Sequence, residues 1–434
     1  MYTPLASSVI YQLFLRPFTP EGTLKGAEKM LPHLRSLGVD IVYLCPINDS
    51  DPDADRAYWS RRMKTCGFDN PKNPYRIRDY YRIDPEYGSD EDLASFVAAA
   101  HALDMRVLLD VVYRHSGPTC ALMREHPDYY RRNPDGTPVA PEYGFPCFDY
   151  DNPAVRAYFT GNLEYYVARF GVDGFRADCG GGMDPEFWRE AIARVRIIRP
   201  DALFLNEGVS RAHLEAGFDL DYGCTWCGEL RRIARGEMDA SELAACFARV
   251  ASRMPEGKYG WRGLENHDFC NDSWEDRLER AVGPELFECA LVLNFTGDGI
   301  PYLYCGNEIG DVTRHSILAN RFVAPNLRIN WSNALTPRAQ ARMELIRRLS
   351  ELRHGHPALA AGRPIEYLCG PREALAYRRA DGGEELLVCA NLSDKPLVFP
   401  LDGRPLEPLL TRQAQCGAQA LSLAPYGFCV CALR

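Results

Sequence analysis

Eight apolar, strand-like runs alternate with helical patterns along most of the chain. The runs cover residues 9–15, 39–47, 105–113, 172–178, 202–208, 218–223, 259–268 and 299–306. Several are almost continuously apolar, which is typical of parallel strands covered by helices. Amphipathic helices are expected between them, at residues 90–103, 152–170 and 185–198. Repeated strand–helix alternation predicts an α/β protein with a closed (β/α)8 TIM barrel.

Two connections, residues 46–79 and 115–150, are longer than a connection inside a barrel normally is. Both follow candidate strands, so both emerge at the C-terminal mouth, where barrel enzymes keep their chemistry. We predict that residues 115–150 form a small subdomain inserted after the third strand. Residues 1–114 and 151–354 would then form the barrel.

After about residue 355 the pattern changes to short strand-like runs separated by turn signals such as DGG and LDG. These runs are residues 365–370, 374–380, 385–392, 396–401 and 428–433. They predict a C-terminal antiparallel β domain, a β-sandwich, over residues 355–434. A chain of 434 residues suits one large and one small domain.

Composition narrows the class of partner. A net charge of −9 argues against nucleic acid, because binding to phosphates requires clustered Lys and Arg. No apolar run approaches the roughly 18 residues of a membrane helix, and no secretory signal is visible, so a cytoplasmic protein is expected. We expect the sixteen cysteines to be reduced, and the single CxxC, Cys224 to Cys227, has no second pair that would complete a metal site.

Four of the candidate barrel strands end in charged or polar residues. The strand ends carry Asp110 with His115, Arg176 with Asp178, Glu207, and His267 with Asp268. A salt bridge could account for one such ending, since Arg176 and Asp178 are two residues apart and share a strand face. Charged side chains are almost never buried without partners, however. Four endings that converge on one barrel mouth predict a carboxylate-rich pocket.

Four ordered motifs add a resemblance to a known family. DVVYRH (110–115), GFRAD (174–178), LNEG (205–208) and ENHD (265–268) resemble the motifs of the α-amylase superfamily, the retaining α-glycosidases and transglycosylases of glycoside hydrolase family 13. The resemblance continues through residues 74–110, 148–159 and 296–310 and covers essentially the whole chain, including the terminal β domain.

The resemblance implies that Asp178 is the nucleophile, Glu207 the general acid/base and Asp268 the third carboxylate. The residue types fit, because retaining cleavage of a glycosidic bond needs two carboxyl groups about 5–5.5 Å apart. We expect Arg176 to lower the pKa of Asp178 and keep it ionised. The charges of Asp178 and Asp268 would raise the pKa of Glu207.

The remaining candidates are substrate-binding or supporting residues. The resemblance implies that His115 and His267 bind hydroxyls of the central sugar, and that Tyr75 stacks against it. A packed core histidine or loop aromatic is the alternative for each. The resemblance implies that Asp110 is mainly structural and supports the site from within the barrel.

Two positions depart from the family pattern. Arg114 stands where the family usually has an Asn that binds calcium, and a guanidinium offers no acceptor, so no calcium is expected there. No other metal or cofactor is expected either. Cys179 and the three glycines at 180–182 replace side chains that would grip a long glucan, which argues against endo-attack on polymeric starch.

The sequence therefore favours a retaining hydrolase of short α-glucosides or malto-oligosaccharides. Three alternatives remain: a transglycosylase or sucrose-type phosphorylase that uses the same carboxylates, a catalytically silent amylase-like binding module, and a metal-dependent barrel hydrolase. His115 and His267 are sparse for the last of these. The oligomeric state is not revealed by the sequence.

Overall fold

The computed structural model describes residues 2–141, 143–223, 225–268 and 276–434. Its larger part is a closed barrel of eight parallel strands in the order β1-β10-β9-β8-β7-β6-β5-β2. The strands are β1 (Ile10–Leu13), β2 (Ile41–Leu44), β5 (Arg106–Val111), β6 (Gly174–Ala177), β7 (Leu203–Asn206), β8 (Leu220–Asp221), β9 (Tyr259–Gly263) and β10 (Ile300–Tyr304). Each lies within one of the eight predicted runs, and the predicted barrel is confirmed.

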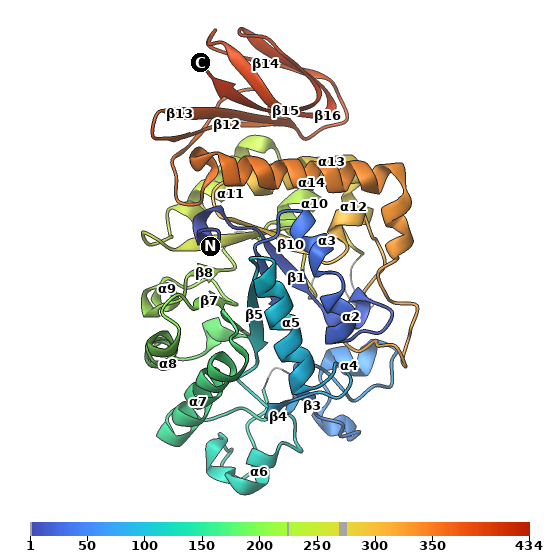
Figure 1. Cartoon of the computed structure of the whole chain (residues 1–434), viewed down its shortest axis with the longest axis vertical. Coiled ribbons are helices and arrows are strands. Elements are labelled where there is room, and N and C mark those ends of the chain that lie inside the picture. The colour runs from blue at the N-terminus through green and yellow to red at the C-terminus, as the bar shows by residue number, and fades with distance from the viewer. Residues whose placement is uncertain (1, 142, 224, 269–275) are drawn as a thin grey trace.

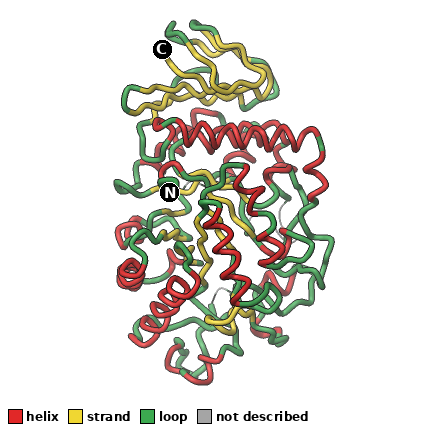
Figure 2. Tube along the Cα trace, in the orientation of Figure 1, coloured by secondary structure: helices red, strands yellow, loops and turns green. Residues whose placement is uncertain are grey.

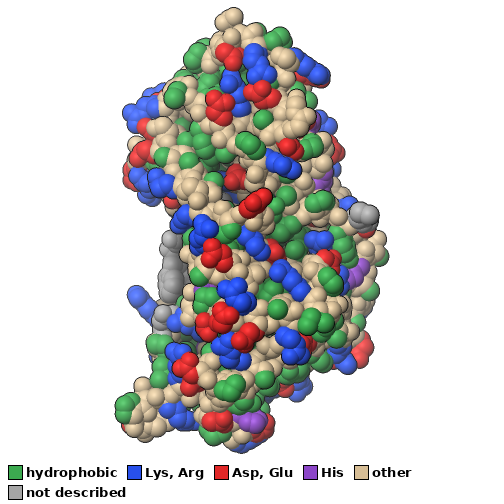
Figure 3. Space-filling model, turned by 90° about the vertical axis from the view of Figure 1, so that its left-hand side faces the viewer, with side chains coloured by type: hydrophobic (Ala, Val, Ile, Leu, Met, Phe, Trp, Pro, Cys, Tyr) green, Lys and Arg blue, Asp and Glu red, His purple; other side chains and the backbone are tan. Residues whose placement is uncertain are grey.

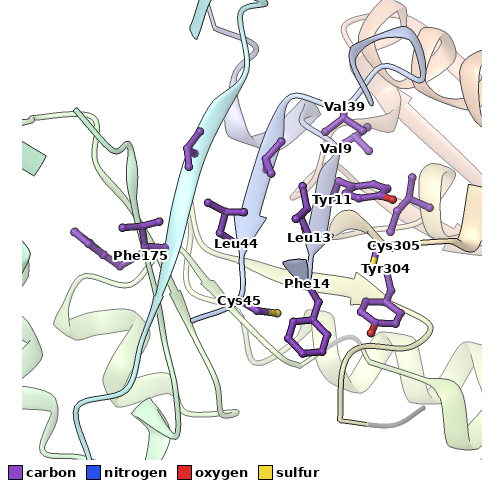
Figure 4. Packing of buried hydrophobic residues seen from close by; sticks show 14 of the residues in the cluster. Val9, Tyr11, Leu13, Phe14, Val39, Leu44, Cys45, Phe175, Tyr304 and Cys305 are labelled. Atoms are coloured by element: carbon purple, nitrogen blue, oxygen red, sulfur yellow. The ribbon is translucent and has the colours of Figure 1, made fainter. Parts of the chain in front are cut away.

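Successive residues of a barrel strand point alternately inward and outward. Outward side chains such as Tyr11, Leu13 and Phe175 belong to the larger core, which packs the strands against the helices (Figure 4). Ile10 and Leu108 belong to a second, smaller cluster that includes Tyr43, Trp261 and Tyr302. Two residues further along the same strands, polar side chains follow, so the polar layer comes at the carboxyl ends of the strands.

The predicted helices are present as α5 (Asp90–Ala102), α7 (Pro153–Phe170) and α8 (Pro185–Ile198). Local chemistry sets their ends: Ser89 and Asp92 form a capping box on α5, and α7 ends at Gly171 with φ of 69°. The other α-helices are α1 (Leu15–Phe18), α2 (Leu24–Glu28), α3 (Leu31–Ser36), α4 (Arg61–Thr65), α6 (Ala121–Glu125), α9 (Arg211–Ala216), α10 (Cys227–Ala234), α11 (Ala240–Ala251), α12 (Leu278–Val282), α13 (Pro284–Thr296) and α14 (Pro337–Gly355). Short 3-10 turns occupy Leu5–Ser7, Arg56–Tyr58, Pro127–Tyr129, Gly180–Gly182, Asn307–Ile309, Trp331–Leu335 and Pro357–Leu359.

The two long connections lie at the same end of the barrel. The first carries an antiparallel pair, β3 (Asn48–Ser50) and β4 (Ile77–Ile83), together with α4. The second follows barrel strand β5, carries α6, and closes on itself through the bridges His115 to Cys147 and Tyr130 to Phe148. In Figure 1, α4, β3, β4 and α6 gather at the lower end. The predicted insertion after the third barrel strand is confirmed, and the exact boundaries at residues 114 and 150 stay a prediction.

The C-terminal domain lies at the other end, beyond α13 and α14 (Figures 1 and 2). Its strands are β11 (Ile365–Tyr367), β12 (Ala374–Asp381), β13 (Glu384–Asn391), β14 (Leu397–Pro400), β15 (Leu406–Cys416) and β16 (Ala420–Leu433). The antiparallel β domain is confirmed. The strands form one sheet instead of the two packed sheets expected, because β16 is long enough to pair with β13 through residues 428–432 and with β14 through 420–423.

Figure 3 shows Lys and Arg interspersed with Asp and Glu on one face of the molecule, over the barrel and the terminal domain alike. Within the described residues, no helix combines the length and the apolar character needed to cross a bilayer. Of the predicted CxxC, Cys227 begins α10, whereas Cys224 lies outside the described residues.

Candidate active site

A cavity of about 470 Å³ opens at the carboxyl ends of the barrel strands. Six of the eight predicted site residues line it: Tyr75, His115, Asp178, Glu207, His267 and Asp268. The other two, Arg176 and Asp110, have fully buried side chains and contact the lining residues from within the barrel. The structure thus brings the separate strand endings into one site.

Asp178 and Glu207 directly follow the neighbouring strands β6 and β7. One carboxylate oxygen of each lies within 4.8 Å of the other. The backbones behind them are in close contact, because Gly181 N donates to Glu207 O at 2.9 Å and a Cβ on Gly208 would lie 2.8 Å from Gly181 Cα. Glycine at these positions lets the two carboxylates approach each other.

Arg176 lies among three carboxylates. Its Nη1 donates to Asp110 Oδ1 at 2.8 Å and to Asp178 Oδ1 at 2.9 Å, and its Nη2 is 3.0 Å from Glu207 Oε2. Burial disfavours the charged form of a guanidinium, but these acidic neighbours prevail and raise the pKa of Arg176 well above its usual range. The arginine therefore remains a fixed positive charge behind the two carboxylates.

The pKa of Asp178 corrects one prediction. Burial and the charge of Glu207 raise this pKa well above its usual range, although Arg176 opposes both. Arg176 lowers the pKa of Asp178 as predicted, but the predicted net lowering was wrong. The reason is that Asp178 is also buried and lies beside a second carboxylate, Glu207. Two carboxylates this close titrate as a pair and can share one proton.

The third carboxylate, Asp268, is held from the side. Arg62 Nη1 donates to its Oδ1 at 3.1 Å, and His267 Nε2 lies 3.3 Å from its Oδ2. Burial opposes ionisation of Asp268, but His267 and Arg62 outweigh it and lower the pKa. Asp268 is thus held as an ionised carboxylate.

Tyr75 and His267 form a stacked pair at the floor of the cavity. Their rings are 5.2 Å apart and 6° from parallel, and Tyr75 OH lies 2.6 Å from His267 Nε2. Tyr75 OH donates to Asp110 Oδ2 at 2.8 Å, and Gln12 Nε2 lies 2.7 Å from His267 Nδ1. Burial lowers the pKa of His267 to about 4 and raises that of Asp110 to about 6. A neutral His267 that accepts from Gln12 and donates to Tyr75 satisfies this network.

His115 is buried on the opposite long connection. Its Nε2 donates to Tyr75 O at 2.9 Å, and its ring lies 5.0 Å from that of Phe145. Burial lowers the pKa of His115 to about 4, so the imidazole is neutral near pH 7. The site therefore contains neutral imidazoles beside the ionised Asp268.

Sequence reasoning missed several lining residues. Arg62 comes from α4 in the first long connection, and Tyr143 and Phe145 come from the second. Tyr222, just after β8, accepts a hydrogen bond from Arg176 Nε at 3.0 Å. The length of the two connections was the available signal, since it indicated functional loops without identifying their contact residues.

A closed (β/α)8 barrel with paired carboxylates at its mouth is an arrangement typical of glycoside hydrolases. A family profile described as "Alpha amylase, catalytic domain" matches residues 8–136, and another described as "Domain of unknown function (DUF3459)" matches residues 366–430. These matches and the relatives below confirm the resemblance of the chain to the α-amylase superfamily of glycoside hydrolases.

Similar proteins include a cyclomaltodextrinase of Geobacillus thermopakistaniensis, 27% identical over 95% of this chain and 70% of that protein. The alpha-amylase MalA of Haloarcula japonica is 27% identical over 91% of this chain. This chain spans only 56% of that relative's length. The crystal structure of an alpha-amylase from Lactobacillus plantarum superposes with a TM-score of 0.82 over 99% of each chain at 23% identity, which shows a shared fold.

Proposed function

We propose that the protein is a retaining α-glycoside hydrolase that acts on short α-glucosides or malto-oligosaccharides. The observation that carries the proposal is the approach of Asp178 and Glu207 oxygens to within 4.8 Å. Retaining enzymes hold their carboxyl groups about 5–5.5 Å apart, whereas inverting enzymes need about 6.5–9.5 Å to admit a water. The separation therefore favours double displacement.

In the first step Asp178 attacks the anomeric carbon while Glu207 donates a proton to the departing glycosidic oxygen, which forms a glycosyl-aspartate. In the second step Glu207 removes a proton from water, and the water releases the sugar from Asp178. Turnover requires the proton on Glu207 and an ionised Asp178. Arg176 supports that arrangement, because its Nη1 donates to the Asp178 oxygen.

The surrounding groups suit a neutral, hydroxylated ring. Tyr75 offers a rigid aromatic face, and the neutral imidazole of His115, whose Nε2 donates to Tyr75 O, offers its Nδ1 as an acceptor for a hydroxyl. Asp268, ionised and partly exposed, is the acceptor for further hydroxyls of a distorted sugar. The names of the relatives, a cyclomaltodextrinase and amylases, support a glucan substrate.

The test is the anomeric configuration of the first product, followed by proton NMR during cleavage of maltotriose-length substrates. We expect the α-anomer before mutarotation, and a loss of kcat of about 10⁴-fold or more in Asp178→Asn and Glu207→Gln. Asp135→Asn, an exposed change in the second connection, is the matched control. A β-anomer, or full activity in Asp178→Asn, would refute the proposal. Repeating the reaction with added glucose or phosphate separates hydrolysis from transfer.

A further inference from the structure

Three thiols meet inside the C-terminal sheet, far from the barrel mouth. The Sγ atoms of Cys416, Cys429 and Cys431 all lie within 4.8 Å of one another, and those of Cys416 and Cys431 are 3.7 Å apart. Cys429 and Cys431 are fully buried, and Cys416 is partly exposed. No disulfide joins them, since all three are free.

The fold creates this cluster from residues that are distant along the β15–β16 hairpin. Cys429 and Cys431 are two residues apart on β16 and share a face, whereas Cys416 pairs with Leu421 at the other end. The hairpin has a register shift between Arg412 and Ala414. Gln413 and Tyr426, on opposite strands, have φ of 51° and 53°. The backbone conformation at this bend folds the hairpin over, so that Cys416 reaches the other two thiols.

The environment of the cluster is apolar. Buried side chains of the same sheet surround it, including Leu387, Phe399 and Leu421, and Cys389 pairs directly with Cys429 on the neighbouring strand. A cysteine in such a core usually serves as a small hydrophobe, which requires no particular direction of its sulfur. Here three sulfurs from two strands point at one another, and the partly exposed Cys416 leaves a route to solvent.

The distances fit metal ligation. Zinc–thiolate bonds of about 2.3 Å in a tetrahedral site place two sulfurs about 3.8 Å apart. The 3.7 Å between Cys416 and Cys431 matches this edge. A disulfide needs a sulfur separation of about 2.05 Å and would use two of the three thiols. Thiolates select soft cations such as Zn²⁺ and Cu⁺.

We propose that Cys416, Cys429 and Cys431 form a three-thiolate site for a soft cation, Zn²⁺ in the first instance, with solvent as the fourth ligand on the Cys416 side. Binding converts three thiols to thiolates and releases three protons, so no oxidant or reductant is required. The site ties the end of β15 to β16. The bound ion therefore stabilises the terminal sheet.

The test uses the full-length chain, reduced and freed of metal. Zn²⁺ is titrated against a chromophoric chelator, and Cd²⁺ is followed by its ultraviolet sulfur-to-metal absorption. We expect one tight equivalent of Zn²⁺, and a thermal unfolding temperature that rises with the metal. Cys416→Ala and Cys431→Ser should lose both effects. Cys369→Ser, an exposed cysteine of the same domain, should keep them.

Cys416→Ala is the decisive variant because its side chain is partly exposed, and circular dichroism reports whether it folds. The proposal is overturned if Cys416→Ala still binds one equivalent, or if the native chain binds none. A thiol count that reveals a Cys416–Cys431 disulfide in the native protein overturns it as well. Loss of the tight equivalent in Cys179→Ala would assign the metal to the barrel mouth, where Asp178, Cys179 and Glu207 also converge.

Discussion

The two ends of the barrel both bury an arginine, but in opposite surroundings. At the mouth, Arg176 contacts Asp110, Asp178 and Glu207 within 3.0 Å, and its pKa is raised. At the other end, Arg353 of α14 donates its four described hydrogen bonds to backbone carbonyls. These belong to Ala6, Phe295, Gly299 and Leu359.

The pKa of Arg353 moves the other way. Burial, together with the like charge of Arg379, lowers it to about 9. Neutral carbonyls can hold a guanidinium in place but cannot offset its charge as carboxylates do. At the closed end of the barrel, opposite the mouth, Arg353 thus holds the segments that precede β1 and β10. At the mouth, Arg176 balances the charge of carboxylates that lie at a cavity.

Replacing Arg176 gives the largest expected effect. Arg176→Met removes the charge behind Asp178 and Glu207, and we expect kcat to fall by about 10³-fold, which corresponds to about 4 kcal/mol. Arg176→Lys, which keeps the charge and loses the fork of donors, should recover part of the loss and a pH–rate profile closer to the native one. Steady-state kinetics on a malto-oligosaccharide measure both. If kcat in Arg176→Met stayed within tenfold of the native value, the claim that the arginine at the mouth serves catalysis would be contradicted.

Replacing Arg353 should affect stability and leave catalysis alone. Arg353→Met leaves backbone carbonyls at this end of the barrel without donors. Each hydrogen bond from a charged group contributes about 1.5–3 kcal/mol, but removing a buried cation offsets part of this loss. We therefore expect the free energy of unfolding to fall by about 3 kcal/mol. Urea unfolding measures the change. A kcat that drops in the folded variant would contradict a purely structural role for this end.

The barrel was predictable because its signal is local. Several strand runs are almost wholly apolar, and helix starts such as Ser89 carry their own capping residues. The strand β15 was missed because its centre, TRQAQ, is mostly polar and none of its residues is buried. β3 and β4 were missed for a related reason: they are a minor pair inside a polar connection.

The site was predictable in its residue types and less so in its energetics. Asp178, Glu207 and Asp268 could be identified because charged residues at strand ends are costly unless they have a shared purpose. The approach of Arg62 to Asp268 depends on how a long connection folds. The net pKa of Asp178 depends on its burial and on the approach of Glu207 to within 4.8 Å, and neither is encoded in a motif.

The glycine contact behind the two carboxylates tests how precisely the mouth is built. Gly208 has φ of 151°, and a Cβ there would lie 2.8 Å from Gly181 Cα. Gly208→Ala should push Glu207 away from Asp178 and lower kcat by about 10²-fold, since displacements near 1 Å cost that much, with a smaller change in KM. Gly257→Ala is the control, because Gly257 has φ of 72° but open space around it. Equal losses in the two variants would mean that backbone strain, and not carboxylate spacing, is responsible.

Acid should lower the stability of the folded protein by protonating the buried His115 at the barrel mouth. His115 has a pKa of about 4 in the folded protein, lowered by burial from about 6.5 in the unfolded chain. A base with a depressed folded pKa binds its proton more readily when unfolded. The stability that neutral His115 contributes is therefore complete above about pH 6.5 and is lost as pH falls toward 4.

Removing that titration should flatten the acid dependence. Between about pH 7 and pH 5, the titration of His115 should lower the free energy of unfolding by about 2 kcal/mol. His115→Gln retains a donor for Tyr75 O and should lack this part of the loss. Urea unfolding at the two pH values measures the difference. His126→Gln, at an exposed position of the same connection, should keep the native slope. Arg353, at the other end of the barrel, stays protonated between pH 5 and pH 7 and therefore contributes no pH dependence in this range. An unchanged slope in His115→Gln would mean that the loss of stability in acid comes from groups other than His115.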